Sequence, residues 1–110
     1  MIKDILSKME TAIDIMNRKG GADAEALAKL LAELKTELQA LPECRLEEAR
    51  SIANFTEAAA HEVLRSNQSM QLKNLSTSGI SYAVKGFEAS HPRLVELAND
   101  ICMSLSRMGI

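Results

Sequence analysis

The chain has 110 residues, 46% of them hydrophobic and 25% charged, and its 13 basic and 15 acidic side chains leave a formal charge of -2. This is the size and composition of one globular domain, which we expect to span residues 1–110. A nucleic-acid partner is not expected, because the chain lacks a basic excess and aromatic residues make up only 3% of it.

The first predicted helix ends at a pair of glycines, Gly20 and Gly21, which cannot continue a helix cheaply. Its apolar residues recur at the helical period and are Ile2, Ile5, Leu6, Met9, Ala12, Ile13 and Met16. Polar and charged residues interrupt this segment, so it has no continuous apolar stretch of the kind found in a signal peptide. Nowhere does the sequence approach the roughly 18 apolar residues of a membrane span, and no membrane association is expected.

The second predicted helix starts after Asp23, which stands where an N-cap belongs, and ends at Pro42. Its apolar positions are Leu27, Leu30, Leu31, Leu34, Leu38 and Leu41. The pattern predicts antiparallel pairing with the first helix across the diglycine turn. Three of these leucines also lie seven residues apart, which leaves a short coiled-coil seam as the alternative.

A long third helix is predicted from Glu43 to about Arg65, because Pro42 and the acids after it suit a helix N-terminus. Its many alanines favour close packing against the second helix or a partner copy. The polar residues 66–69 predict a break. A fourth helix then runs to Phe87, with Gly79 as a point where another backbone comes near.

The stretch FEASHPRL, residues 87–94, is predicted to be the joint between the fourth and fifth helices. Glu88 ends the fourth helix, Ser90 or His91 supplies the cap, and Pro92 starts the fifth helix. Phe87 and Leu94 are expected to pack across the bend and to force an antiparallel hairpin. The fifth helix is expected to end on a Schellman motif in which Gly109 is the left-handed residue and Ile110 touches Leu105.

The same stretch, followed by the terminal MGI, resembles the signature of a family of small bacterial proteins catalogued as domain of unknown function 4404. The resemblance rests on Phe87, Glu88, Ser90, His91, Pro92, Leu94, Met108, Gly109 and Ile110. It covers about the last quarter of the chain. The resemblance implies a short, cytoplasmic, helical bacterial protein of unassigned activity, and it brings no catalytic residues with it.

A catalytic or metal-binding role for the joint is the competing interpretation. An acid such as Glu88 can orient the imidazole of His91 as a general base, but Ser90 is its immediate neighbour, which makes nucleophilic attack through His91 awkward. A metal site would require His61, His91, Glu88 and Cys102 to converge. We expect structural capping instead, with Glu88 holding His91 or Arg93.

Cys44 and Cys102 stand far apart without a second thiol or a histidine at metal-ligand spacing. We therefore expect two free, half-buried thiols in a reducing cytoplasm, and no cofactor.

The sequence predicts an all-α fold of four to five amphipathic helices, arranged as antiparallel hairpins joined by a long central helix. The hypothesis for function is a non-enzymatic protein–protein interaction or assembly module, self-associating as a homodimer or binding another helical protein. The alternative is a small-ligand or metal-binding bundle that uses His61 or His91.

Overall fold

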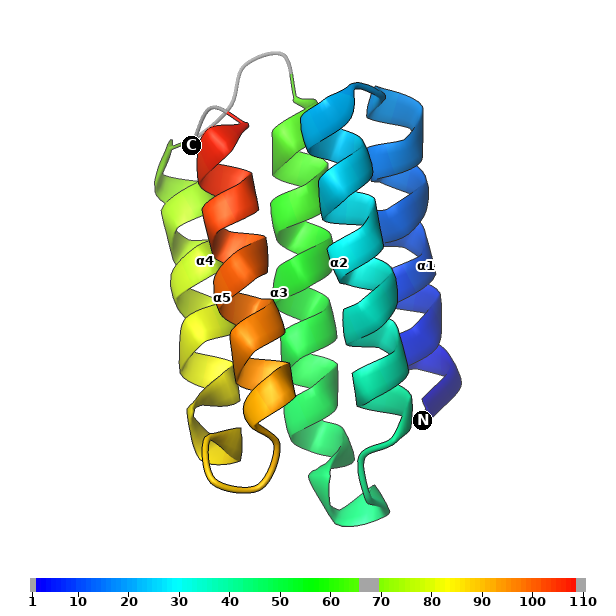
Figure 1. Ribbon diagram of the computed structural model, residues 1–110, viewed down its shortest axis with the longest axis vertical. Helices are drawn as coiled ribbons and strands as arrows, with labels where there is room; N and C mark the ends of the chain where they lie inside the picture. Colours follow the sequence, from blue (N-terminus) through cyan, green and yellow to red (C-terminus); the bar gives the residue numbers. More distant parts are fainter. Residues whose placement is uncertain (1, 66–69, 109–110) are drawn as a thin grey trace.

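The computed structural model describes residues 2–65 and 70–108, and within these ranges it contains helices and turns but no strand (Figure 1). The all-α prediction is confirmed. The helices are α1 (Ile2–Lys19), α2 (Ala22–Gln39), the 3-10 helix η1 (Glu43–Arg45), α3 (Leu46–Leu64), α4 (Met70–Val84), the 3-10 helix η2 (Lys85–Phe87) and α5 (Pro92–Arg107). Together they measure 38 × 22 × 21 Å along the principal axes.

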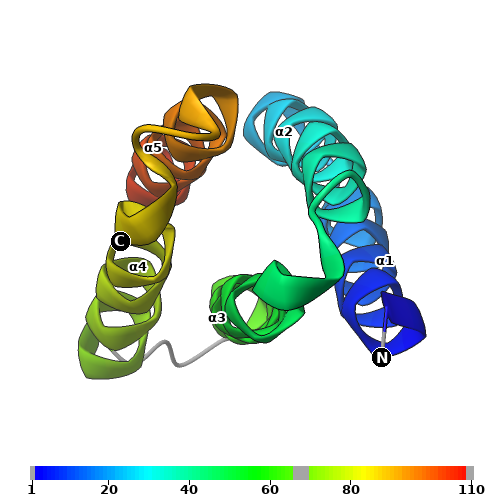
Figure 2. The ribbon, with the colours of Figure 1, turned by 90° about the horizontal axis from the view of Figure 1, so that it is seen from below.

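The helices form two antiparallel hairpins joined by α3, as the sequence predicts. α1 pairs with α2, α4 pairs with α5, and α3 packs against α1 on one side and α4 on the other. Because α2 also contacts α5, the helices close into a ring when seen along the bundle (Figure 2). The expected packing of the third helix on the leucine-rich second helix is wrong, since α2 buries its leucines between α1 and α5 instead.

The turn between α1 and α2 depends on two glycines with positive φ. Gly20 has φ +69° and Gly21 has φ +96°, a region that side chains other than glycine rarely enter. α2 begins at Ala22 with Gly21 as its N-cap, so the prediction that Asp23 is the cap is wrong. Asp23 lies inside the first turn, where its charge still suits the helix dipole.

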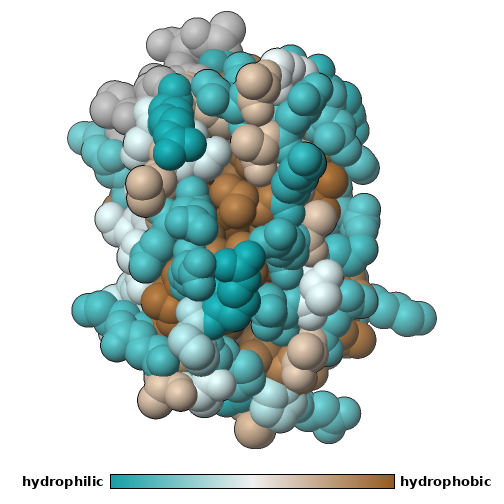
Figure 3. Space-filling view, viewed as in Figure 1, coloured by the Kyte–Doolittle hydropathy of each residue, from teal (hydrophilic) through white to brown (hydrophobic). Residues whose placement is uncertain are grey.

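The core lies inside the ring and is aliphatic except for Phe87 and the methionines. α3 lines it with small side chains, including Ala49, Ala53, Ala59 and Ala60, which let neighbouring helices approach closely. The largest fully buried side chains are Phe87, Ile5, Met9, Met16, Leu27, Leu31, Leu34, Leu38, Ile52, Ile80 and Leu94. On the face shown in Figure 3, hydrophilic side chains predominate, and hydrophobic ones show as small patches between them, the most prominent near the centre.

The joint between α4 and α5 is confirmed as a bend, and its N-cap residue is His91, one of the two predicted positions, although no side chain makes the capping bond. The regular helix ends at Val84 and tightens into η2, and the amide N–H of His91 donates to the carbonyl of Phe87 at 2.8 Å. His91 is the N-cap residue before Pro92, with φ −139° and ψ 68°, outside the helical region as expected before proline. No side chain caps α5. The hydroxyl of Ser90 bonds to the His91 ring instead.

A contact that the sequence did not indicate fixes the same end of the bundle. The guanidinium carbon of Arg45, in η1, lies 4.0 Å from the centre of the Phe87 ring, and Arg45 Nη2 donates to the carbonyl of Gly86 at 3.0 Å. The Arg45 guanidinium is also held by Glu48, at 2.8 Å through Nε. Phe87 and Leu94 are fully buried in the shared core. The bend is therefore held by apolar packing on its inner side and by the Arg45 contacts on its outer side.

The two thiols are free, as expected, but they differ in exposure. Cys102 is half-buried as predicted, whereas Cys44 is exposed, because it lies in η1, where no residue is buried. Among the described residues, no helix is long and apolar enough to cross a membrane. The predicted break at residues 66–69 and the predicted cap formed by Gly109 and Ile110 lie outside the described residues.

Candidate functional site

The residues that sequence reasoning singled out for metal binding do not converge. His61 is exposed near the end of α3, whereas His91 starts α5 at the opposite end of the bundle (Figure 1). Cys102 lies between them along α5. Among residues 2–65 and 70–108, no three His, Cys, Asp or Glu side chains are grouped so that they could hold a metal ion.

Ser90 and His91 form a pair, but at an exposed bend. The Oγ of Ser90 lies 2.9 Å from Nδ1 of His91, and the His91 ring meets the Phe87 ring edge-on, with centroids 5.6 Å apart. Glu88 is exposed, and in the described part of the chain it pairs with neither His91 nor Arg93. Arg93 pairs with Glu33 of α2 at 2.7 Å and with Glu96 at 3.0 Å. The expected role of Glu88 is therefore wrong.

The surface feature that stands out lies on α4 instead. Of its exposed large apolar side chains, the two most exposed are Leu75, at 66%, and Tyr82, at 77%. They are seven residues apart, which is two helical turns, so they share one face of the helix. The other exposed large hydrophobic residues that the structure describes are Phe55, Leu64, Leu72 and Met103.

The position of Gly79 brings one of these, Phe55 of α3, alongside α4. A Cβ atom at Gly79 would lie 2.4 Å from Cδ1 of the Phe55 ring. The prediction that another backbone approaches Gly79 is therefore wrong, because the neighbour is a side chain. The ring is 38% exposed, so it borders the outer face of α4 rather than joining the core.

Charge distinguishes α4 from the other helices. It carries one charged residue, Lys73, in 15 residues, whereas α1 carries seven in 18 and α2 carries six in 18. Its outward-facing side also contains Gln71, Asn74 and Ser78, which are polar but uncharged. In Figure 3 the left edge, where α4 lies, accordingly shows pale side chains of intermediate hydropathy.

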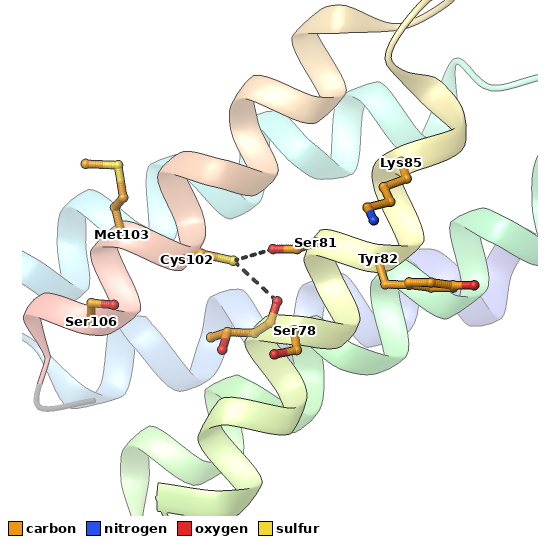
Figure 4. Close-up of a pocket in the computed structure, with 8 residues that line it drawn as sticks. Ser78, Ser81, Tyr82, Lys85, Cys102, Met103 and Ser106 are labelled. Atoms are coloured by element: carbon orange, nitrogen blue, oxygen red, sulfur yellow. Dashed lines mark hydrogen bonds between the residues drawn. The ribbon is translucent and has the colours of Figure 1, made fainter.

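A groove of about 440 Å³ runs between α4 and α5 beside this face (Figure 4). Hydroxyl groups form much of its lining, and the residues are Thr77, Ser78, Ser81, Tyr82, Lys85, Cys102, Met103 and Ser106. A second hollow of about 410 Å³ lies along the same helix, lined by Gln71, Asn74, Leu75 and Ser78. Ser78 belongs to both, so the outer side of α4 is one continuous, shallow surface.

Cys102 forms part of the groove, but its thiol is not activated as a nucleophile. Its Sγ lies 3.7 Å from the carbonyl oxygen of Thr77, to which it donates, and 3.9 Å from the hydroxyl of Ser81 (Figure 4). Burial raises the pKa of the Cys102 thiol, and the contact with Ser81 offsets this only in part. The thiol therefore stays protonated near neutral pH, and a protonated thiol is a poor nucleophile.

The outer face of α4, which we define as Gln71, Asn74, Leu75, Ser78 and Tyr82 together with Lys85 at the start of η2, was not identified from the sequence. The sequence clue to this face is the run from 70 to 84, which contains one charged residue and in which Leu75 and Tyr82 lie two turns apart. Periodicity alone does not separate an apolar residue that faces the core from one that faces water. Only the packing of α4 between α3 and α5 shows which side is left uncovered.

Comparison with known proteins places most of the chain in one family. A family model described as Domain of unknown function (DUF4404) matches residues 27–110. No match was found among the curated proteins or among the solved structures.

Proposed function

The chain belongs to the DUF4404 family, whose description names no activity, and we propose that it is a non-enzymatic protein–protein interaction module that self-associates through the outer face of α4. The observation that carries this proposal is the exposure of Leu75 and Tyr82 on the least charged helix of the bundle. Large apolar side chains left exposed among uncharged polar ones are typical of interaction sites.

A second copy of the chain is the occupant that the charge pattern favours. A two-fold symmetric contact buries the same surface on both copies, so every charge on that surface is removed from water in each of them. Most faces of this protein carry several charges, whereas the outer face of α4 carries only Lys85 at its edge. This face can therefore meet its own copy, or another apolar surface, while burying few charged groups.

The non-enzymatic part of the proposal is supported by the reactive groups themselves. The Ser90 and His91 side chains bond to each other on an exposed bend, and within residues 2–65 and 70–108 no acid pairs with the ring. The Cys102 thiol is held in its protonated form. The two unpaired cysteines support a reducing compartment, and we place the protein in the cytoplasm.

Sedimentation velocity across a dilution series tests the proposal. We expect a reversible dimer whose dissociation constant rises at least about 100-fold in Leu75→Glu, because a charge buried without a partner costs several kcal/mol. Ala32→Glu is the matched control: it adds the same charge at an exposed position on α2 and should leave association unchanged. A wild-type protein that stays monomeric at high micromolar concentration would refute the proposal.

A further inference from the structure

We propose that the groove between α4 and α5 binds a small phosphate monoester. The groove belongs to a single copy of the chain, so this proposal does not depend on self-association. Two features of the groove support it: the charge of its lining, and hydroxyl groups that have no partner in the described part of the protein (Figure 4). Its volume of about 440 Å³ is typical of small-molecule sites.

The lining that the structure describes carries one charge, and it is positive. Lys85 lines the groove from η2, and its ammonium lies 5.8 Å from the centre of the Tyr82 ring. Within residues 2–65 and 70–108 it makes no ion pair. No acidic side chain is among the described lining residues, and the sequence has no Asp or Glu outside the described ranges. An anion can therefore enter this groove without meeting a like-charged side chain in its wall.

The hydroxyl groups in the groove are available as donors. Hydroxyls elsewhere in the bundle, such as those of Thr36 and Ser51, donate to the carbonyl four residues earlier in their own helix. Ser78 and Ser106, in contrast, make no hydrogen bond with the described residues. The hydroxyl of Ser81 contacts a sulfur atom, at 3.9 Å. Two hydroxyls from α4 and one from α5 can therefore donate to the oxygen atoms of a ligand.

These donors fit a phosphate better than a carboxylate. A planar carboxylate is best matched by the two parallel N–H groups of an arginine, and none of the described lining residues is arginine. Lysine binds phosphate as a point charge. The several oxygen atoms of a phosphate can accept from the Lys85 ammonium and from more than one hydroxyl at the same time.

The groove is longer than a free phosphate ion, which indicates an ester. Lys85 and Ser78 are seven residues apart, or about 10 Å along the helix, so a phosphate held by Lys85 and Ser81 fills only one end. The wall on the α5 side includes Met103, which is 56% exposed, and the uncharged thiol of Cys102 (Figure 4). We expect the organic part of the ligand to lie against this wall, where it would cover apolar surface.

An NMR titration of the isotope-labelled full chain with phenyl phosphate, at neutral pH and constant ionic strength, tests the site. The amide signals of residues 77–85 and 102–106 should shift and then saturate. Phenyl phosphate should bind at least about tenfold more tightly than inorganic phosphate, because its ring buries apolar surface. Benzoate, which carries the same ring on a carboxylate, should bind more weakly than phenyl phosphate.

Variants assign the binding to the proposed donors. Lys85→Met should weaken the binding of phenyl phosphate at least about tenfold, and Ser81→Ala at least about threefold, because each removes a donor to a charged ligand. Both residues are exposed, so neither change should disturb the fold. Lys3→Met is the matched control: it removes an exposed lysine from α1, on the opposite side of the ring from α4 (Figure 2), and should leave the affinity unchanged.

Several results would overturn the proposal. Signal shifts that never saturate, or that do not favour α4 and α5, would mean that the groove is not a binding site. An equal loss of affinity in Lys85→Met and Lys3→Met would mean general attraction to a basic surface. Benzoate binding as tight as that of phenyl phosphate would refute the choice of phosphate, and equal binding of inorganic phosphate would refute the ester. Self-association is measured separately by sedimentation, and none of these results bears on it.

Discussion

Replacement of Arg45 by methionine should destabilise the protein by about 2 kcal/mol. Methionine keeps the unbranched stem but removes the guanidinium, which contacts the Phe87 ring at 4.0 Å and bonds to the Gly86 carbonyl at 3.0 Å. A cation over an aromatic face contributes about 0.5–1 kcal/mol, and a hydrogen bond from a charged donor about 1.5 kcal/mol or more. The ion pair with Glu48 is partly exposed and adds little.

Arg93→Met is the matched control for this experiment. Arg93 makes ion pairs with Glu33 and Glu96, but its side chain is 47% exposed, so its loss should cost less than about 1 kcal/mol. Urea unfolding measures both free energies, and thermal unfolding should show a decrease of about 8 °C in the midpoint for Arg45→Met. If the two variants lose the same stability, Arg45 does not fix the bend, and the stability of the joint must come from the buried Phe87 and Leu94 alone.

Two further predictions concern the surroundings of α4. Gly79→Ala should stabilise the protein by up to about 1 kcal/mol in a Phe55→Ala background, because alanine favours the helix. It should not do so in the wild type, because the new Cβ would collide with the Phe55 ring. A double-mutant cycle on unfolding free energies measures this coupling, and additive effects would contradict it. Cys102 should react with iodoacetamide far more slowly than Cys44 at neutral pH, and its rate should still rise above the usual thiol pKa. The raised pKa of Cys102 also makes stability depend on pH: the contribution of this thiol is complete below its unfolded-state pKa and is lost as pH rises through its folded-state pKa. Cys102→Ala should therefore reduce the loss of stability at alkaline pH, measured by urea unfolding at several pH values. An unchanged pH dependence would count against the burial of this thiol.

The helices could be predicted from the sequence because each one has a long apolar stripe at the helical period. The residues at which the helices begin could not be predicted from that pattern. Asp23 has the side chain of a good cap, but the positive φ of Gly21 lets the chain turn one residue earlier, so α2 starts at Ala22. At Pro42 the chain first makes a 3-10 turn before α3 begins at Leu46. These choices differ by small local energies that side-chain patterns do not resolve.

The contacts between distant segments were even harder to predict from the sequence than the first residues of the helices. Arg45 and Phe87 are 42 residues apart, and nothing in either local sequence indicates that they meet. The identity of the neighbours of α3 depends on how two hairpins close into a ring, which is a property of the whole chain. Self-association was a hypothesis from the sequence without a surface assigned to it, and the exposed face of α4 could be located only from the positions of α3 and α5 beside it.

The composition of α4 connects its weakness as a helix with its suitability as a contact surface. Ser76, Thr77, Ser78 and Gly79 are poor helix formers, and the buried side chains described on this helix are only Ser76, Ile80 and Val84. The same small, uncharged residues leave its outer side smooth and free of repulsion. A second copy on that side would add apolar burial to the helix that has the least of its own, so association and the order of α4 should stabilise each other.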